Sequence, residues 1–283
     1  MLKVIKSGFY TTIQDSGRFG YRAYGVPVSG VMDSYSSHFA NSILGNDADC
    51  AVLEITMSGP ELHFLEPTQI AIAGADMAPM LNGNVISNNQ VVGIRPNDIL
   101  SFAGLRIGLR CYLALKEGLK TNEVLGSRSM YKTITESDTI KAGDEIYYEK
   151  ASTNSIKTYS NVKYDQSLIS VNIIEVEKGP EYDELSQDQK DKLSSFQFEV
   201  SKLNNRMAYQ LKPLLPNTLK AIITSPVLPG TVQLTPNGNL IVLMRDCQTT
   251  GGYPRVLQLT ERSLNILSQK RQGDILYFRL NVL

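Results

Sequence analysis

The peptide Gln248–Pro254 combines an amide, two hydroxyls, two glycines and a phenol within seven residues. It follows the apolar run Leu240–Met244, which has the length of a buried strand, so we expect the peptide at a strand end. Its glycines allow the backbone to approach a bound molecule closely. The peptide could therefore bind a small polar ligand, although Gly-Gly is also common in hairpin turns and bulges. Its candidate ligand contacts are Gln248, Thr249, Thr250, Gly251 and Tyr253.

A second polar region lies between Thr11 and Asn46, where several glycines and Pro27 predict mostly loop. Loops of that length in a compact domain are usually functional or disordered, and the aromatic residues here favour order. The fork of Arg18 matches a carboxylate or phosphate, and Gln14 can both donate and accept hydrogen bonds. Asp15 could orient Arg18 or accept a proton. A salt bridge in a tight surface turn is the alternative.

This region ends in a predicted helix. Asp33 can cap its start, apolar residues recur about every four positions from Tyr35, and Gly45 can terminate it. Asp33 and Asn41 are candidate substrate contacts, and Asn41 falls on or near the polar side with His38. We expect His38 to be structural or exposed, because a lone histidine has no partner for base catalysis.

Three more charged residues are candidates. Glu54 follows Ala51-Val52-Leu53 at a probable strand end, where burial would raise its pKa and make it a base; an exposed glutamate is the alternative. Arg128 and Arg206 each lie beside small polar residues, as anion recognition would require. Surface loops produce the same pattern, so neither arginine is specific alone.

The composition indicates a globular protein without a polyanion-binding surface. In 283 residues, 28 Lys and Arg balance 28 Asp and Glu, which disfavours nucleic acids and anionic membranes as partners. The N-terminus lacks the apolar segment of a signal peptide, and no apolar stretch is long enough for a membrane span, so we expect a cytoplasmic protein. Three widely spaced cysteines suggest neither disulfides nor a zinc site, and two histidines cannot complete a metal site.

Short apolar runs separated by turns dominate the chain and predict a mainly β protein, a sandwich or barrel. Examples are the runs 69–74, 90–94 and 109–115, whereas a charged segment near 184–196 is predicted as a surface helix. A turn residue, an Asp and an alternating strand recur at 97–102, 143–148 and 273–278. This weak repeat suggests two β lobes, residues 1–165 and 166–283, with a polar bridge over 151–166.

Common nucleotide and hydrolase motifs are missing from the sequence. It contains no G-x-x-x-x-G-K-[ST] phosphate loop, no G-x-S-x-G nucleophile elbow and no H-E-x-x-H. No lysine has the Met-Lys-Met setting of a biotin carrier, so this chain has no biotin attachment site. Nucleotide or biotin chemistry would have to come mainly from another chain.

Taken in order, these segments resemble a known family. The motifs are T-I-Q-D-S-G-R-F-G, G-V-P-V-S-G-V-M-D, A-N-S-I-L-G-N, L-G-S-R-S, N-R-M-A-Y-Q-L and C-Q-T-T-G-G-Y-P. Together they resemble the family of the 5-oxoprolinase C subunit, which includes allophanate hydrolase subunit 2, the KipA proteins and part of the carboxyltransferase region of urea carboxylase. The resemblance covers nearly the whole chain, from Val4 to Phe278.

The resemblance implies two related cyclophilin-like β-barrel lobes and partners similar to 5-oxoprolinase subunits A and B. It also implies ATP-dependent hydrolysis of 5-oxoproline to glutamate. The ATP and its Mg would be bound mainly by or with a partner subunit, and this chain alone would have little activity. Arg18 and Arg128 would clamp anions, and Asp15 or Glu54 would position or deprotonate a nucleophile. The peptide Gln248–Gly252 would supply hydrogen-bond donors.

Two other functions stay open: the carboxyltransferase component of a biotin-dependent urea or amide carboxylase, and a non-catalytic KipA-like antagonist of a kinase inhibitor. The chain also departs from the family pattern. Met130, Gln210 and Pro226 replace a hydroxyl, a charge and a carboxylate that are usual in the family, which bears on whether the C-terminal lobe binds the usual substrate.

Overall fold

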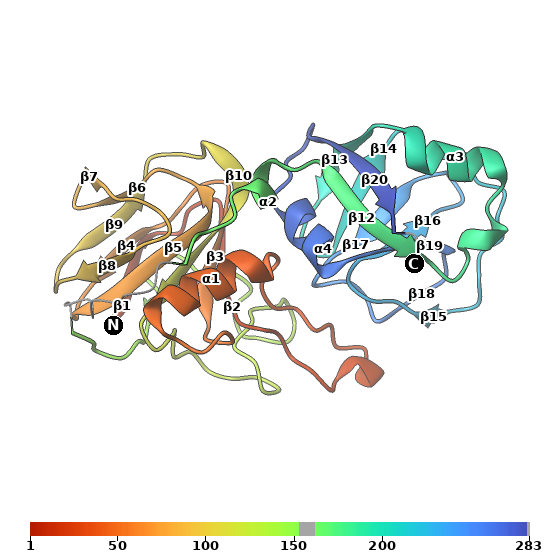
Figure 1. Ribbon diagram of the computed structural model, residues 1–283. Helices are drawn as coiled ribbons and strands as arrows, with labels where there is room; N and C mark the ends of the chain where they lie inside the picture. Colours follow the sequence, from red (N-terminus) through yellow and green to blue (C-terminus); the bar gives the residue numbers. More distant parts are fainter. Residues whose placement is uncertain (153–161, 282–283) are drawn as a thin grey trace. The chain divides into compact units, whose positions relative to one another are not determined.

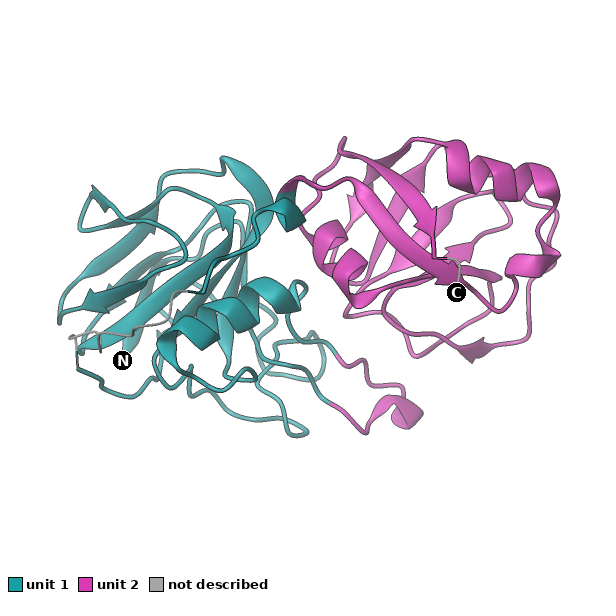
Figure 2. Ribbon diagram, viewed as in Figure 1, with its two compact units in different colours: residues 1–18, 29–169 teal, residues 19–28, 170–283 magenta. Residues whose placement is uncertain are grey.

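The computed structural model describes residues 1–152 and 162–281, and its chain divides into two compact units (Figure 2). Unit 1 comprises residues 1–18 and 29–169, and unit 2 comprises residues 19–28 and 170–283. The sequence pattern placed one division near residue 165, whereas here residues 19–28 group with the later part of the chain. Most of the predicted polar bridge, residues 153–161, lies outside the described residues.

Unit 1 is built from two antiparallel sheets (Figure 1), and an apolar core forms between their buried side chains. The six-stranded sheet has the order β11 (Glu145–Ile146), β1 (Leu2–Lys6), β4 (Glu61–Phe64), β9 (Ile99–Phe102), β6 (Pro79–Leu81) and β7 (Asn84–Val85). The five-stranded sheet has the order β2 (Tyr10–Gln14), β3 (Val52–Thr56), β10 (Ile107–Leu115), β5 (Thr68–Asp76) and β8 (Val91–Ile94).

The burial of the core strands of unit 1 follows from their apolar composition. In β10 and β5 almost every residue is buried, because one face of the sheet packs into the main core and the other lies under a helix. Leu53, Ile72 and Leu113 belong to the main core, whereas Ala71, Ala73 and Ala114 belong to the cluster beneath that helix. The small alanines let the helix backbone come close to the sheet.

That helix is α1 (Ser34–Leu44), and it begins and ends as predicted. The Asp33 carboxylate accepts a hydrogen bond from the Ser36 amide, and Gly45 ends the helix in the left-handed conformation that glycine adopts readily. Phe39, Ala40 and Leu44 are buried against the sheet. The short helix α2 (Ser167–Ser170) spans the division between the two units.

Unit 2 contains a closed seven-stranded barrel. Its strands, in order around the barrel, are β12 (Ile173–Lys178), β19 (Arg255–Leu259), β16 (Thr231–Leu234), β17 (Leu240–Leu243), β14 (Ala208–Lys212), β13 (Phe198–Asn204) and β20 (Ile275–Leu280). β12 and β20 pair in parallel, and the other neighbours are antiparallel. Closure leaves this sheet without exposed edges, and the expected mainly β fold is confirmed.

Helices and a small ladder complete unit 2. α3 (Gln187–Ser195) begins with a capping box between Ser186 and Gln189 and matches the predicted surface helix. α4 (Glu261–Ser268) is capped by Thr260. Two 3₁₀ turns, η1 (Arg22–Tyr24) and η2 (Tyr182–Glu184), also belong to this unit, and β15 (Ser225–Pro226) pairs with β18 (Thr250–Gly251) outside the barrel.

Candidate functional site

In unit 1, the carboxylate of Asp15 holds the segment Ser127–Ser129 against the end of β2. Its Oδ1 accepts hydrogen bonds from the Gly17 amide at 2.8 Å and from the Ser127 and Ser129 hydroxyls, both at 2.6 Å. Its Oδ2 accepts from the Arg128 amide at 2.5 Å. Oδ1 therefore has three donors and Oδ2 has one, and together they tie the segment Ser127–Ser129 to the end of β2.

The guanidinium of Arg18 is buried beside the same segment. Arg18 Nη2 donates to the Ser129 carbonyl at 2.6 Å, and its Nε lies 3.4 Å from the Val124 carbonyl. Arg128, by contrast, is partly exposed and pairs with Glu123 at 2.8 Å. The structure thus brings the predicted residues Asp15, Arg18 and Arg128 together around one loop segment.

Glu54 lies in the middle of β3 and is fully buried, so both the expected strand-end position and the exposed alternative are wrong. Its Oε2 accepts hydrogen bonds from the Met32 amide at 2.7 Å and from the Tyr112 hydroxyl at 3.0 Å. Arg110 Nε lies 3.9 Å from Glu54 Oε1. Burial, and then the negative charge of Glu54, raise the pKa of Tyr112 well above its usual value.

The remaining candidates of unit 1 hold the chain around α1 and β2. The Asp33 amide donates to the Tyr112 hydroxyl at 2.8 Å, which links the cap of α1 to Glu54. Asn41 is buried and its side chain donates to the Cys50 carbonyl at 2.8 Å. Gln14 is also buried, and its Nε2 donates to the Met130 carbonyl and the Thr12 hydroxyl, both at 3.1 Å.

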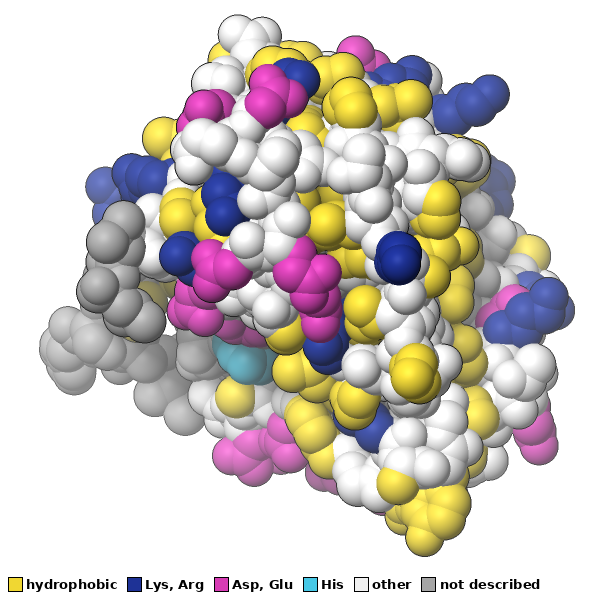
Figure 3. Space-filling model, turned by 90° about the vertical axis from the view of Figure 1, so that its right-hand side faces the viewer, with side chains coloured by type: hydrophobic (Ala, Val, Ile, Leu, Met, Phe, Trp, Pro, Cys, Tyr) yellow, Lys and Arg dark blue, Asp and Glu magenta, His cyan; other side chains and the backbone are white. Residues whose placement is uncertain are grey.

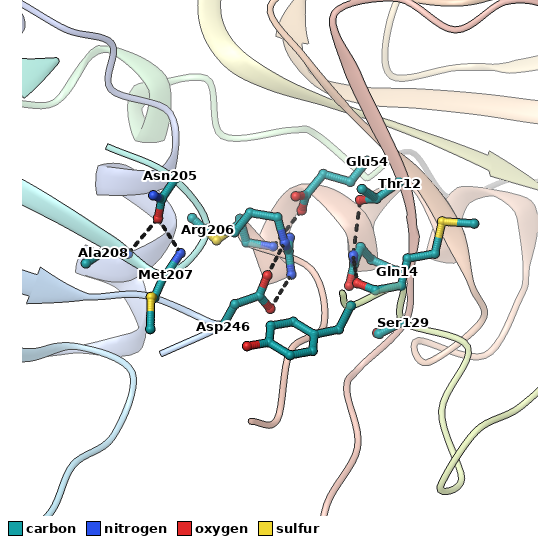
Figure 4. Close-up of polar contacts among 12 residues, drawn as sticks. Thr12, Gln14, Glu54, Ser129, Asn205, Arg206, Met207, Ala208 and Asp246 are labelled. Atoms are coloured by element: carbon teal, nitrogen blue, oxygen red, sulfur yellow. Dashed lines mark hydrogen bonds and ion pairs between the residues drawn. The ribbon is translucent and has the colours of Figure 1, made fainter. Parts of the chain in front are cut away.

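In unit 2, Arg206 forms a buried two-point ion pair with Asp246 (Figure 4). Arg206 Nε lies 2.8 Å from Asp246 Oδ2, and its Nη2 lies 3.0 Å from Oδ1. The Asp246 amide also donates to the Arg206 carbonyl. This pair fastens the turn before β14 to the turn after β17, just ahead of the peptide Gln248–Tyr253.

That peptide is held at its backbone, while several of its side chains reach the surface. The Val227 amide donates to the Thr249 carbonyl at 3.1 Å and the Ile222 amide to the Gly252 carbonyl at 3.0 Å. Thr250 is exposed, and Tyr253 is 40% exposed. The predicted strand before it is confirmed as β17, and the exposed Thr250 follows a backbone that these hydrogen bonds hold in place.

Two residues near this peptide were missed by sequence reasoning. Arg22 Nη2 contacts the Val227 carbonyl and lies 3.4 Å from the Thr249 carbonyl. Burial raises the pKa of the neighbouring Cys247 thiol to about 11, although Arg22 acts in the opposite direction. Gln233 is buried beneath Gly251; a polar residue between the apolar Val232 and Leu234 was the available signal.

Two kinds of binding feature are relevant to the described parts of the chain: a metal site and a membrane-spanning helix. Within residues 1–152 and 162–281, no three His, Cys, Asp or Glu side chains are grouped so as to hold a metal ion. In the same ranges no helix is long and apolar enough to cross a bilayer. On the face in Figure 3, basic and acidic side chains are interspersed among apolar ones.

Comparison with known proteins identifies the family to which this fold belongs. Residues 24–280 match the family model described as carboxyltransferase domain, subdomain A and B. The chain belongs to this family. It is 33% identical to the C subunit of 5-oxoprolinase from Escherichia coli over 98% of this chain and 90% of that protein.

Two further relatives match this carboxyltransferase-family chain. Urea amidolyase of Lachancea kluyveri is 42% identical over 46% of this chain and 7% of its own length. The crystal structure of TTHA0988 superposes with a TM-score of 0.89 at 28% identity, over 98% of this chain. The chain spans 55% of the TTHA0988 chain. The matches to the 5-oxoprolinase component and to TTHA0988 each cover 98% of this chain, whereas the urea amidolyase match covers 46% of it.

Proposed function

We propose that this chain is the C component of a cytoplasmic, ATP-dependent 5-oxoprolinase, which hydrolyses 5-oxoproline to glutamate together with subunits A and B. The observation that carries the proposal is the likeness to the C subunit of 5-oxoprolinase along nearly the full length of both proteins. A match of that extent includes the polar residues of unit 1 and the peptide of unit 2.

The chemistry sets requirements for the site. A lactam is a poor electrophile, and transfer of a phosphoryl group from ATP to its oxygen would create an activated imidate that water can open. Such a site needs hydrogen-bond donors toward the lactam oxygen and a grip on the substrate carboxylate. In this proposal the donors are the Thr249 and Thr250 hydroxyls, and support comes from the backbone hydrogen bonds of Val227 and Ile222 that hold this peptide.

The groups of unit 1 have a positioning role in this proposal. Asp15 accepts four hydrogen bonds from Gly17 and the segment Ser127–Ser129, so it fixes the loop that carries Arg128. Glu54 fixes Met32, next to the helix cap Asp33, in the same way. The nucleophile is then a water molecule, activated with the help of a partner subunit.

ATP and its Mg are assigned mainly to a partner. The arginines predicted to clamp anions already have partners within the chain, because Arg18 binds the Ser129 carbonyl, Arg128 pairs with Glu123 and Arg206 pairs with Asp246. The sequence also has no phosphate-binding glycine loop followed by Lys. Consequently, we expect little or no hydrolysis by this chain alone.

The test is an omission experiment. ATP-dependent glutamate formation from 5-oxoproline is measured with candidate A and B partners, with this chain present or left out. We expect turnover only in the complete mixture. Equal turnover without this chain, or robust turnover by this chain alone, would contradict the proposal. Arg18→Ala serves as a probe of the Ser129 contact, and unchanged turnover would count against a role for Arg18.

A second candidate function is supported by the family description and the urea amidolyase relative: the carboxyltransferase component of a biotin-dependent urea or amide carboxylase. This reaction needs a biotinylated partner, because the sequence has no biotin carrier lysine. Streptavidin blotting of material that co-purifies with the chain separates the two functions. A biotinylated partner, together with no 5-oxoproline turnover, would favour the carboxylase.

A further inference from the structure

The side-chain amide of Gln233 is buried next to the peptide Gln248–Tyr253, and within residues 1–152 and 162–281 its nitrogen has no hydrogen-bond partner. Gln233 lies in β16 and is 2% exposed. Its Oε1 lies 3.4 Å from Gln248 Nε2, a long hydrogen bond, whereas its Nε2 has no hydrogen-bond partner among the described residues. A buried N–H group left unpaired is costly, so its presence calls for a physical reason.

Gln258, in the adjacent strand β19, provides a matched comparison. Both amides pack against a glycine: a Cβ added at Gly251 would lie 2.4 Å from Gln233 Nε2, and one added at Gly230 would lie 2.5 Å from Gln258 Nε2. Gln258, however, is satisfied, because its Nε2 donates to the Pro229 carbonyl at 2.9 Å and its Oε1 accepts from Thr231. Close packing under a glycine therefore does not require an unpaired amide.

The location of the unpaired Gln233 nitrogen indicates how a ligand could reach it. It lies against the backbone of Gly251, in the ladder of β15 and β18, which consists of only two residue pairs. Backbone hydrogen bonds from Val227 to Thr249 and from Ile222 to Gly252 hold the peptide on both sides of this ladder, so access to the nitrogen requires a local shift of Gly251 between them. Movement of Gly251 would open the nitrogen of Gln233 to the surface at which Thr250 is exposed.

We propose that Gln233 is a ligand-binding residue whose Nε2 donates a hydrogen bond to the carbonyl or carboxylate oxygen of a small amide bound at Gln248–Tyr253. Gly251 has no side chain because the amide needs that space. This inference rests on the proposed function for the identity of the amide as 5-oxoproline, but the binding role itself applies to any small amide with an acceptor oxygen.

Two variants separate binding from stability. Gln233→Met keeps the length of the side chain and removes the unpaired donor, so the melting temperature of the unliganded chain should rise by about 2–4 °C. Gln258→Met is the control: it removes the hydrogen bonds of the Gln258 side chain to Thr231, Pro229 and Leu259, so its melting temperature should fall. A purely structural Gln233 would instead lower the melting temperature when replaced.

Binding is measured with 5-oxoproline and, separately, with urea. The NMR signals of the Gln233 side-chain amide are followed in the full chain, and the KM for 5-oxoproline is measured in the assembled complex. We expect saturable shifts of these signals with 5-oxoproline and at least a tenfold higher KM for the Gln233→Met complex. The Gln258→Met complex should keep the wild-type KM.

The outcomes distinguish this inference from the proposed function. Shifts with urea but none with 5-oxoproline would support the binding role of Gln233 and contradict the assignment to a 5-oxoprolinase. Turnover of 5-oxoproline with an unchanged KM in Gln233→Met would overturn the inference and leave the proposed function intact. Gln233 signals that respond to neither compound, in the chain or in the complex, would also overturn it.

Discussion

The Asp15 cluster of unit 1 and the peptide Gln248–Tyr253 of unit 2 both looked like binding sites in the sequence, yet their polar groups are used differently. Asp15 accepts four hydrogen bonds, and all of them come from Gly17 and the segment Ser127–Ser129. The peptide in unit 2 is fixed by its backbone and exposes Thr250, and it covers the side-chain nitrogen of Gln233, which has no hydrogen-bond partner among the described residues.

Supporting residues differ from binding residues in whether their hydrogen bonds are satisfied within the chain. A polar side chain whose hydrogen bonds are all satisfied within the chain contributes mainly to stability, whereas a polar group that remains unpaired at a surface peptide is available to a ligand. By this criterion, replacements in the Asp15 cluster should reduce stability, and replacements near Gly251 should affect substrate binding.

The largest expected effect is that of Asp15→Ala. It leaves the hydroxyls of Ser127 and Ser129 and the amides of Gly17 and Arg128 without their acceptor, so the free energy of unfolding should fall by about 3 kcal/mol. Urea denaturation measures this change. Asp144→Ala is the control, because Asp144 accepts one exposed hydrogen bond from the Lys141 amide. A loss no larger than that of the control would contradict the supporting role.

Gly251→Ala should have the next largest effect. The added Cβ would lie 2.4 Å from Gln233 Nε2 and 3.4 Å from Val227 Cγ1, and such overpacking costs about 2 kcal/mol. Gly252→Ala is a close control, since the nearest atom to its Cβ is the Ile222 carbonyl oxygen at 3.5 Å. Thermal denaturation of both variants checks the difference, and equal melting temperatures would show that Gly251 has no packing constraint.

Tyr112→Phe tests the buried link between Glu54 and the cap of α1. Without the hydroxyl, Glu54 loses a donor and the Asp33 amide loses its acceptor, which should lower the free energy of unfolding by about 1.5 kcal/mol. Tyr147→Phe, at a side chain that is 64% exposed, should change it little. Equal urea midpoints for the two variants would argue against the link.

The smallest expected effect is a pH dependence in unit 2. Hydrogen bonds from Arg255 lower the pKa of Glu181 below its usual value of 4.5. Stability from this pair is therefore present above about pH 4.5 and lost as the pH falls through the lowered pKa. Glu181→Gln should be less stable than the wild type by about 1 kcal/mol at pH 7.

The measurement for this prediction is urea denaturation of both proteins across the acid range. The difference between wild type and Glu181→Gln should shrink as the pH falls below 4.5. Glu261 pairs with Arg245 in the same unit, but its carboxylate side chain is 58% exposed against 12% for that of Glu181, so Glu261→Gln is the control and should show little pH-dependent difference. A constant difference for Glu181→Gln would exclude the linkage.

Local patterns in the sequence predicted much of the fold. The caps Asp33 and Gly45 located α1, and alternating or apolar runs located β5, β10 and β17. Helix caps and apolar runs depend on residues that are adjacent in the sequence. The position of Glu54 could not be predicted, because its burial depends on Arg110 and Tyr112 in another strand.

The candidate site shows the same limit. Composition identified the peptide Gln248–Tyr253, but the unpaired amide of Gln233 becomes visible only when β16 is placed beneath Gly251. Similarly, the arginines were recognised as anion-binding candidates from their neighbours in sequence. The actual partner of Arg206, Asp246, lies 40 positions away, and that of Arg18, the Ser129 carbonyl, lies 111 positions away.

The most direct test of the division between supporting and binding residues is the KM for 5-oxoproline of complexes containing Thr249→Val/Thr250→Val or Ser127→Ala. The double variant removes surface hydroxyls from the peptide, and Ser127→Ala removes a hydrogen bond to Asp15. We predict that the double variant raises KM about tenfold, the equivalent of about 1.4 kcal/mol, with an unchanged melting temperature. Ser127→Ala should lower the melting temperature and leave KM unchanged. An unchanged KM in the double variant, together with a raised KM in Ser127→Ala, would contradict the account.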